Sequence, residues 1–481
     1  MASMPRIQTE QPLVVDLDGT LLCSDLLLET GLAFARAHPA RLLQPFLWLT
    51  QGKAKLKDGL ARSTTLDVSR LPYDLEVIAL IEAERQKGRR IILATASHHT
   101  LAERVAEHLQ LFDDVIASDA DRNLSAQQKK DALVQRFGEG GFDYVGNAHD
   151  DLPVWRAARQ AYVVNPERGL EPHVRQIDNL AAVIRSNQPA LRDWVKALRF
   201  HQWTKNLLIF VPLLAAHRLS DLALVAQGLL AFLLFGVCAS SVYLLNDLLD
   251  LGDDRHHATK RHRPFAAGRL SLKSGLLAFP LLLRAAFAGA LWLLPIAFAS
   301  VLAVYYALTL AYSLVLKRRM VIDVMALASL YTLRIIAGAA ALTIPLTFWM
   351  LAFSMFMFLS LALVKRYAEL RQARVKGDTD PARGRGYYPS DLEMLASLGG
   401  ASGYVAVMVL ALYINDLSAT ALYRHPEIIW LACPLLLLWI SRVWMLTHRG
   451  QMHDDPVVFA IRDRISLIIG ALFGLVFWAA T

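Results

Sequence analysis

The sequence predicts two domains of different classes: a doubly wound α/β domain over residues 1–190 and an all-helical membrane bundle over residues 191–481. Apolar residues make up 55% of the 481 residues, and the mean hydropathy of +0.35 is high for a water-soluble protein. The first part of the chain nevertheless carries an ordinary mixture of charges, whereas from about residue 205 onward long apolar runs alternate with short polar loops. Such a contrast within one chain indicates two domains.

Three short apolar segments predict parallel strands in the N-terminal domain. QPLVVDLDGT, RRIILATAS and FDYVGNAHDD each join a β-branched or apolar run to a polar turn, as buried parallel strands do. Polar side chains at the strand ends then share one edge of the sheet, where α/β folds bind their ligands. These side chains belong to Asp16, Asp18, Thr95, Asn147 and Asp151.

The same segments resemble the four motifs of the haloacid dehalogenase superfamily of phosphatases. DLDGT matches the first motif, LAT the second, Lys130 in QQKKDAL the third and GNAHDD the fourth. The resemblance covers residues 12–185 and implies that the helix-forming insert between residues 22 and 72 is a small cap. Asn147 departs from the pattern, because the fourth motif usually begins with an acid.

The resemblance also implies roles for these residues. Asp16 matches the nucleophile, since a carboxylate can attack phosphorus and divide hydrolysis into two steps. Asp18 would act as general acid and then as general base, and Thr95 and Lys130 would hold the phosphoryl oxygens. A Mg²⁺ ion suits hard oxygen ligands, here Asp16, Asp18, Asn147 and Asp151. A phosphatase fold that is inactive and serves only for docking is the alternative.

The C-terminal half contains about nine segments with the roughly 20 mainly apolar residues that cross a bilayer. They begin near Asn206, Leu222, Leu276, Phe298, Val321, Leu346, Met394, Ile428 and Val458. Lys and Arg are concentrated in the loops that follow the second, fourth, sixth and eighth segments. By the positive-inside rule, we expect the N-terminal domain and both active sites on the cytoplasmic side of the inner membrane. This topology accounts for the net charge of +8 without a nucleic acid partner.

The segment NDLLDLGDD places a row of acids at the end of an expected membrane helix. Asp247, Asp250 and Asp254 have the spacing i, i+3, i+7, which puts them on one face of a helix. Like charges repel there, and ionisable residues at membrane depth are costly unless they function. We expect Lys260 and Arg263 to be too few to neutralise this face, so Mg²⁺ bound to a diphosphate is predicted. A solvated helix end is the simpler alternative.

This motif, followed by K-x-x-R-P, resembles the UbiA superfamily of intramembrane prenyltransferases. The resemblance covers residues 190–481. It implies Mg²⁺ held by Asp247, Asp250 and Asp254, catalytic roles for Asp247 and Asp250, and substrate contacts from Asn246, Lys260 and Arg263. The second motif of the superfamily is incomplete, because Leu327 replaces its second acid. Asp323 matches the first acid, and the resemblance implies that it contacts substrate.

Four segments are similar to one branch of that superfamily, the decaprenyl-phosphate phosphoribosyltransferases. They are HQWTKNLLIFVPL, KRRMVIDVMALAS, LVKRYAEL and THRGQMHDDPVVFAIRD. In that branch the donor is phosphoribosyl pyrophosphate and the acceptor is a polyprenyl phosphate. Cations expected on cytoplasmic loops or at the start of the first span would bind the phosphates. They are Lys205, Lys317, Arg318, Lys365 and Arg366.

Together the two resemblances imply a bifunctional enzyme with one Mg²⁺ in each domain. The membrane domain would transfer 5-phosphoribose from phosphoribosyl pyrophosphate to polyprenyl phosphate. The N-terminal domain would then remove the 5-phosphate, giving a polyprenyl phosphoryl ribose for cell-envelope glycans. Two alternatives stay open: an aromatic prenyltransferase of quinone or lipid synthesis with an accessory phosphatase-like domain, and a non-enzymatic transporter or scaffold.

Overall fold

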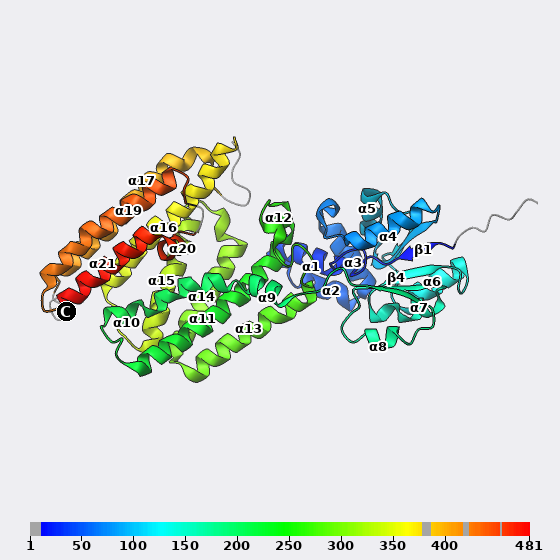
Figure 1. The fold of residues 1–481 in the computed structure, drawn as a ribbon, viewed down its shortest axis with the longest axis horizontal. Coiled ribbons are helices and arrows are strands. Elements are labelled where there is room, and N and C mark those ends of the chain that lie inside the picture. Colours follow the sequence, from blue (N-terminus) through cyan, green and yellow to red (C-terminus); the bar gives the residue numbers. More distant parts are fainter. Residues whose placement is uncertain (1–10, 378–385, 417–422, 453–454) are drawn as a thin grey trace, which may run out of the picture. The chain divides into compact units, whose positions relative to one another are not determined.

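A computed structural model describes residues 11–377, 386–416, 423–452 and 455–481 (Figure 1). The chain forms two compact units. One contains residues 1–198 together with residues 243–279, and the other contains residues 199–242 together with residues 280–481. The segment NDLLDLGDD and the loop that follows it therefore belong to the same unit as the N-terminal domain.

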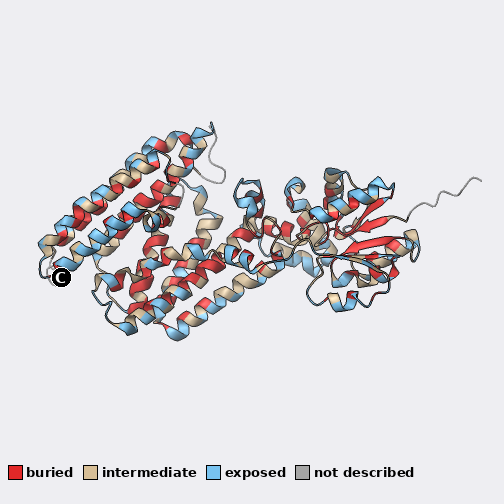
Figure 2. Ribbon diagram, viewed as in Figure 1, coloured by how far each residue is buried: buried red, intermediate tan, exposed pale blue. Residues whose placement is uncertain are grey.

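The first unit is built on a parallel six-stranded sheet with the order β3-β2-β1-β4-β5-β6. The strands are β1 (Leu13–Val15), β2 (Ile91–His98), β3 (Asp114–Ser118), β4 (Asp143–Gly146), β5 (Ala161–Val164) and β6 (Leu180–Ile184). Figure 2 shows strands such as β1, β2 and β4 as buried, whereas the edge strands β3 and β6 are mostly half-buried or exposed. Strands covered on both faces are predominantly apolar, which explains why short apolar runs identified them.

Helices cover both faces of this sheet, as the doubly wound prediction requires. Leu13 and Val15 face one core with α4 (Leu75–Gln86) and α5 (His99–Leu109). Val14 faces the other core, to which α6 (Gln127–Phe137), α7 (Leu152–Ala157) and α8 (Glu171–Val174) contribute. The insert after β1 is helical, as expected: α1 (Leu26–Ala37), η1 (Pro39–Arg41), α2 (Gln44–Thr50), α3 (Lys53–Ser63) and η2 (Val68–Arg70).

After β6, the first unit contains helix α9 and a connection between two long helices. The elements are α9 (Leu191–Leu198), the end of α11 (Leu222–Leu249), α12 (Leu251–His256), η5 (Lys260–His262) and the start of α13 (Leu272–Leu293). Gly275 packs against Phe265 and Leu248, where a Cβ would lie 2.7 Å from the Phe265 ring. This close approach holds the two long helices together beside the connection.

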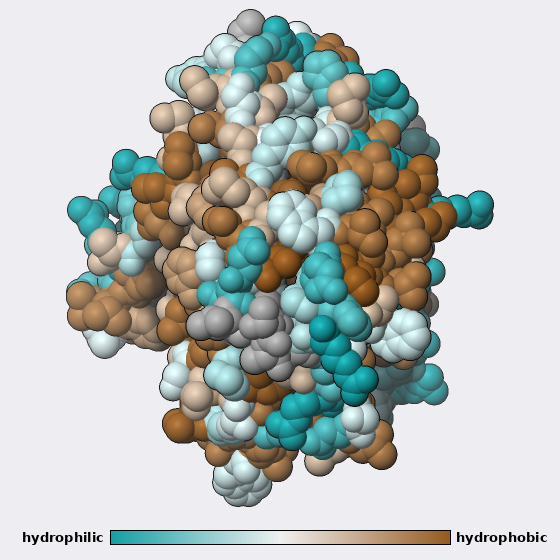
Figure 3. Space-filling view, turned by 90° about the vertical axis from the view of Figure 1, so that its left-hand side faces the viewer, coloured by the Kyte–Doolittle hydropathy of each residue, from teal (hydrophilic) through white to brown (hydrophobic). Residues whose placement is uncertain are grey.

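The second unit is a helical bundle. Its further elements are η4 (Phe200–Phe210), α10 (Val211–Ala215), α14 (Ile296–Leu314), η6 (Leu316–Arg318), α15 (Ile322–Leu342), α16 (Phe348–Val375), η7 (Pro389–Asp391), α17 (Leu392–Ile414), η8 (Pro426–Leu431), α19 (Ala432–His448), α20 (Pro456–Arg462) and α21 (Arg464–Ala480). Helix α15 is the most enclosed of the apolar helices, with 61% of its most apolar window buried. Much of the remaining apolar surface is exposed (Figure 3), as in a bundle that faces lipid.

Within the described residues, seven helices are long and apolar enough to cross a membrane, or eight if α20 and α21 form one span. The predicted count of nine is not reached. The segment expected to begin near Asn206 is divided between a 3₁₀ helix, η4, and the short α10, and the pair α20 and α21 bends by 81°. The chain is a multi-pass membrane protein. Periodicity and hydropathy located its apolar segments, but they did not distinguish continuous helices from broken ones.

Candidate active sites

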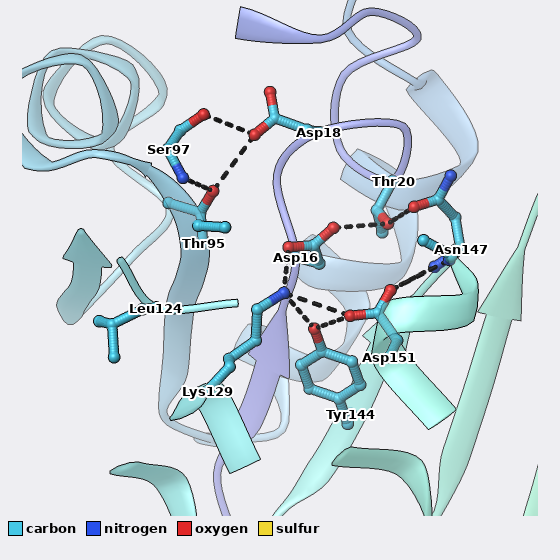
Figure 4. A network of polar contacts seen from close by, with 12 residues as sticks. Asp16, Asp18, Thr20, Thr95, Ser97, Leu124, Lys129, Tyr144, Asn147 and Asp151 are labelled. Atoms are coloured by element: carbon cyan, nitrogen blue, oxygen red, sulfur yellow. Dashed lines mark hydrogen bonds and ion pairs between the residues drawn. The ribbon is translucent and has the colours of Figure 1, made fainter. Parts of the chain in front are cut away.

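One lysine joins two carboxylates at the carboxyl edge of the sheet (Figure 4). Lys129 Nζ lies 2.7 Å from Asp16 Oδ1 and 3.2 Å from Asp151 Oδ1. The Tyr144 hydroxyl donates to Asp151 over 2.7 Å. Burial opposes the charge of Lys129, but Asp151 and Asp16 outweigh it and raise its pKa above the usual range. Burial also raises the pKa of Asp16 to about 7, against the opposing effect of Lys129.

The carboxylate of Asp18 is held at the end of β2. It accepts hydrogen bonds from Ser97 Oγ at 2.6 Å and from the Leu26 amide at 2.7 Å, and the Thr95 hydroxyl lies 3.4 Å away. Burial is the main cause that raises the pKa of Asp18 to about 6, and the bonds from Ser97 and Leu26 oppose it. A carboxyl group with such a pKa exchanges protons near neutral pH, as a general acid and base must.

Asp16 and Asn147 present oxygen atoms to one hydroxyl group. Thr20 Oγ1 lies 3.3 Å from both Asp16 Oδ2 and Asn147 Oδ1. The loop passes Asn147 at Gly19, which has φ +78° and whose added Cβ would lie 2.3 Å from Asn147 Nδ2. Only glycine satisfies both conditions. The turn in DLDGT thus brings the first and fourth motifs together.

This arrangement suits a Mg²⁺ ion that completes its ligands with substrate and water. In the described ranges, no three His, Cys, Asp or Glu side chains are grouped for a metal. Mg²⁺ commonly uses one or two carboxylates together with phosphate oxygens and water. The carboxylate of Asp16 and the amide oxygen of Asn147 fit that requirement. The carboxylates of Asp18 and Asp151, also predicted as ligands, are directed to Ser97 and Lys129 instead.

The predicted lysine needs a correction of one residue. Lys130 lies near Asp131, with 4.0 Å between Nζ and Oδ1, and is half-exposed, whereas Lys129 is buried against Asp16. Neighbouring residues of a helix point about 100° apart, so only one of two consecutive lysines can face the strand ends. QQKKDAL does not specify which one does, and Lys129 therefore replaces Lys130.

Asp16 and Asp18 open into a cleft of about 690 Å³. Several of its lining residues are cations of the N-terminal domain: Lys57, Arg168 and Arg185. Others belong to the connection between the two apolar helices α11 and α13: Gly268, Arg269, Ser271, Leu272 and Lys273. Asn187 fixes this connection by donating to the Gly268 carbonyl over 2.6 Å. The cleft is therefore built from two sequence regions that the predicted domain boundary separates.

In NDLLDLGDD, two of the three aspartates predicted to share a helix face converge on one arginine. Arg263 Nη1 lies 3.1 Å from Asp247 Oδ1 and 2.7 Å from Asp254 Oδ2. Asp250 faces elsewhere and pairs with Arg36 of α1 at 3.0 Å. The expectation that cations are too few here is wrong, because Arg36 pairs with Asp250 from a distant part of the sequence. Two carboxylates aimed at one cation also suit Mg²⁺.

The incomplete second motif forms a buried ion pair. Asp323 Oδ2 lies 2.6 Å from Arg366 Nη2, and these side chains are 0% and 1% exposed. The Tyr387 hydroxyl donates to Asp323 over 2.6 Å. Arg366 also contacts Glu369, and it lies with Lys365 inside α16 rather than on the expected cytoplasmic loop. Asp323 and Arg366 thus bind each other, which corrects their predicted role as substrate contacts.

A second buried cluster surrounds Asp455. Lys205 Nζ lies 2.8 Å and Lys365 Nζ 3.2 Å from Asp455 Oδ2, and the Tyr331 hydroxyl lies 2.9 Å from Oδ1. The predicted cations Lys205 and Lys365 therefore meet on one carboxylate. Asp455 was not predicted as a site residue. An acid directly before a proline is nevertheless the usual signal for the start of a helix, and Asp455 precedes Pro456 at the start of α20.

The comparisons with known proteins agree with both halves. Residues 207–468 match the UbiA prenyltransferase family, and residues 13–156 match the haloacid dehalogenase-like hydrolases. The chain belongs to the UbiA prenyltransferase family. Its N-terminal part is a haloacid dehalogenase-like domain, so this UbiA protein combines a transferase domain with a phosphatase-type hydrolase domain.

Three relatives of this UbiA protein differ in how much of the chain they share. An uncharacterized protein, y4nM of Sinorhizobium fredii, is 38% identical over 97% of this chain and 90% of its own. Nodulation protein NoeC of Azorhizobium caulinodans is 41% identical over 59% of this chain and 92% of its own. Decaprenyl-phosphate phosphoribosyltransferase of Mycobacterium tuberculosis is 31% identical over 60% of this chain and 92% of its own.

The UbiA domain also buries a cation that the sequence analysis missed. Arg334, in α15, donates to Asn206 over 3.1 Å and to the Leu330 carbonyl over 2.5 Å, and its guanidinium lies 5.1 Å from the centre of the Tyr305 ring. An arginine in the middle of an apolar helix is costly without such contacts. The signal was present in the sequence as the single charge in YTLRIIAGA.

The remaining predicted residues of the UbiA domain occupy its polar connections or helix ends. Asn246 lies in the last turn of α11, Lys260 begins η5 and is exposed, and Lys317 and Arg318 end η6. Lys317 is half-buried and Arg318 is exposed. The substrate-binding role of these four residues stays a prediction.

Proposed function

We propose that this protein transfers 5-phosphoribose from phosphoribosyl pyrophosphate to a polyprenyl phosphate and then hydrolyses the 5-phosphate. The observation that carries this proposal is the composition of the cleft beside Asp16. Arg269 and Lys273 line it, and they come from the connection between two apolar helices of the UbiA domain. Residues of the UbiA sequence thus help to form the cleft of the hydrolase domain. Such a cleft suits a substrate that the transferase domain produces.

In the transfer step, the bond between ribose C1 and the pyrophosphate oxygen breaks, and a bond from C1 to an oxygen of the lipid phosphate forms. Asp247 and Asp254 would hold a Mg²⁺ ion, which supplies positive charge to the departing pyrophosphate. The cluster of Lys205, Lys365 and Asp455 carries one excess positive charge and would position an anionic phosphate. A lipid phosphate is already ionised, so no general base is needed.

In the hydrolytic step, Asp16 Oδ would attack the phosphorus of the 5-phosphate, and the bond to the ribose oxygen breaks. Asp18 would give its proton to that oxygen. Asp18 would then take a proton from water as the water oxygen attacks phosphorus, which releases phosphate and restores Asp16. Lys129 would keep Asp16 oriented and balance its charge, and a Mg²⁺ ion at Asp16 and Asn147 would screen carboxylate from phosphate.

The buried pair of Asp323 and Arg366 argues against the alternative of an aromatic prenyltransferase. That reaction is expected to use a second acidic motif for its prenyl diphosphate. Here Leu327 replaces one acid, and Asp323 is enclosed by Arg366 and Tyr387. The relative named decaprenyl-phosphate phosphoribosyltransferase supports the sugar donor instead. We propose the product as a pentose donor for envelope glycans, made at the cytoplasmic face of the inner membrane.

The test is mass spectrometry of the lipid formed by the purified full-length protein from phosphoribosyl pyrophosphate, polyprenyl phosphate and Mg²⁺. We expect polyprenyl phosphoryl ribose from the natural sequence and its 5-phosphorylated form from Asp16→Asn. Asp247→Asn is expected to give neither, while its hydrolysis of p-nitrophenyl phosphate continues. No pyrophosphate release from the natural sequence would reject the transferase assignment, and an unphosphorylated lipid from Asp16→Asn would reject the hydrolytic one.

A further inference from the structure

The cap of the hydrolase domain has an exposed apolar face on α2 and the turn before it. Leu42, Leu43, Phe46, Leu47 and Leu49 are 48%, 76%, 66%, 63% and 46% exposed. The helix is nevertheless fixed in place. Its Trp48 packs edge-on against Phe34 at 5.5 Å between ring centres, and a Cβ on Gly59 would lie 2.6 Å from Trp48. The apolar side chains therefore form the outward face of an anchored helix.

The preceding helix α1 is attached to the end of an apolar helix long enough to cross a membrane. Arg36 donates to the carbonyl of Leu249, the last residue of α11, over 3.2 Å. Glu29 binds Arg255 of α12 in a buried, two-bond ion pair, with N–O distances of 3.0 and 2.6 Å. These bonds fix α1 beside the point where α11 leaves the apolar region.

The link from Arg36 to α2 is short. Gln44, the first residue of α2, lies eight positions after Arg36, and an extended chain advances about 3.5 Å per residue. The helix η1 shortens this link further. The exposed apolar face is therefore tied within about 28 Å of the end of α11, a distance close to the thickness of the hydrocarbon core.

The charges around α2 also match a lipid surface. Residues 31–57 contain five cations but no Asp or Glu. Arg36 pairs with Asp250 and Asp253, Lys55 pairs with Asp121, and Lys57 lines the hydrolase cleft. Arg41 and Lys53 are exposed on either side of the helix. Leu, Phe and Trp side chains flanked by cations, without acids, are typical of helices that lie in a membrane interface, where anionic lipids attract Lys and Arg.

We propose that α2 is an interfacial anchor, whose outward face inserts into the bilayer surface. The occupant of this apolar face is thus lipid rather than a second protein chain. Insertion would hold the cap, and with it the opening of the hydrolase cleft, at the level of lipid headgroups. The inference does not depend on which substrate the enzyme uses, and its test needs none.

The test places a fluorescent, environment-sensitive label on the full-length protein at Phe46→Cys and, separately, at Leu43→Cys. Each variant is reconstituted at one chain per nanodisc in phosphatidylcholine and phosphatidylglycerol, with and without lipids that carry a quencher. Cys238 and Cys433 are buried, and burial raises the pKa of Cys23 to about 12, so background labelling is expected to be low. Labelled protein without either substitution measures that background.

We expect lipid-borne quencher to reduce the emission of both labels severalfold more than that of a label at Glu107→Cys. Glu107 is exposed on α5, outside the sequence of the cap and of α2. Equal quenching at all three positions would overturn the proposal. A label on α2 that stays accessible to aqueous iodide in discs, but changes when chains are crowded in detergent, would assign this face to a second copy and would overturn it equally.

Discussion

Two buried clusters, one in each domain, are built from the same parts with opposite charge. In the hydrolase domain, Lys129 lies between the carboxylates of Asp16 and Asp151. In the UbiA domain, the carboxylate of Asp455 lies between Lys205 and Lys365. Each cluster also includes a tyrosine hydroxyl that donates to a carboxylate. Tyr144 donates to Asp151 over 2.7 Å, and Tyr331 donates to Asp455 over 2.9 Å.

The charge balance of each cluster indicates what it can attract. One lysine and two carboxylates leave the first cluster with one excess negative charge, which favours a cation such as Mg²⁺. Two lysines and one carboxylate leave the second with one excess positive charge, which favours a phosphate. In each cluster the central residue holds its two neighbours close despite their like charges, and the uncompensated charge is left for a ligand.

The neutral pair of Asp323 and Arg366 marks the limit of this comparison, because each charge already has its partner. Among the substitutions considered below, we expect the largest effect when this pair is broken, and the affected quantity is the free energy of unfolding. Removing one partner, as in Arg366→Met, leaves an uncompensated buried carboxylate and costs about 3–5 kcal/mol. Replacing both, as in Asp323→Leu with Arg366→Met, should cost markedly less. Thermal unfolding in detergent measures both.

Loss of transfer without loss of stability in Arg366→Met would contradict this structural role. That result would instead return Arg366 to the substrate contacts predicted from the sequence. Lys317→Met is the matched control, since Lys317 lies at the half-buried end of η6 and its substitution should leave unfolding almost unchanged.

The next effect concerns the central lysine of the first cluster. Lys129→Met keeps the side-chain volume but removes the positive charge between Asp16 and Asp151. The two carboxylates then repel each other, so Asp16 is expected to bind a proton and to become a weaker nucleophile. We expect hydrolysis of p-nitrophenyl phosphate to fall about 10²–10³-fold, as on removal of one stabilising group from other active sites. Transfer of phosphoribose should continue.

The adjacent residue supplies the control for Lys129. Lys130→Met removes the same chemical group from a half-exposed position near Asp131, and its hydrolytic rate should stay near that of the natural sequence. A larger loss in Lys130→Met than in Lys129→Met would show that the third motif acts through Lys130 after all.

The central carboxylate of the second cluster should have a smaller effect. Asp455→Asn leaves Lys205 and Lys365 without the negative charge between them, so one lysine is expected to turn away or lose its proton. We expect transfer to fall about 10–100-fold, the usual loss when a residue that orients a binding group is removed. Radiolabelled phosphoribosyl pyrophosphate measures the rate, and hydrolysis should not change.

Asp463→Asn is a suitable comparison for Asp455→Asn. Asp463 also precedes a helix and pairs with a cation, Arg442, at 2.7 Å. Asn caps a helix about as well as Asp, so the substitution removes mainly the charge that pairs with Arg442, which should cost about 1 kcal/mol or less of stability without changing transfer. An unchanged rate in Asp455→Asn would separate the lysine cluster from the reaction.

The sequence predicted the first cluster far better than the second, and the sheet explains why. Strands of a parallel sheet end at one edge, and β1 and β4 are neighbours in this sheet. The motifs DLDGT and GNAHDD, which follow these strands, therefore bring Asp16 and Asn147 together. The predicted lysine, Lys130, was wrong by one residue, because the sequence does not determine which of two consecutive helical residues faces the strand ends. The sequence also could not show that Asp18 and Asp151 bind protein partners.

The membrane bundle lacks such a rule. Hydropathy located the apolar helices, but neighbours across a bundle depend on how each helix is rotated about its axis, which hydropathy does not determine. Lys205 and Asp455 are 250 positions apart, and Asp323 and Arg366 lie in different helices. Composition also does not show where an apolar segment is interrupted. Segments such as η4 with α10 are therefore not continuous helices, and the number of long helices falls below nine in the described part of the chain.

The smallest expected effect would sharpen the metal assignment of the first cluster. Asn147 presents a neutral amide oxygen beside Asp16, with Thr20 donating to both. Asn147→Asp adds a negative charge to a Mg²⁺ site without changing its size, and greater ligand charge strengthens binding. We expect the Mg²⁺ concentration for half-maximal hydrolysis to fall about tenfold, within the range typical of changes around a metal.

Two results distinguish this interpretation from a general increase in negative potential. Asp150→Asn removes an exposed neighbouring carboxylate and should leave the Mg²⁺ requirement unchanged. In Asn147→Asp, hydrolysis at saturating Mg²⁺ should stay close to that of the natural sequence, because Asp16, Asp18 and Lys129 are unaltered. An identical Mg²⁺ requirement in Asn147→Asp and the natural sequence would mean that the ion, if bound, is held away from Asn147.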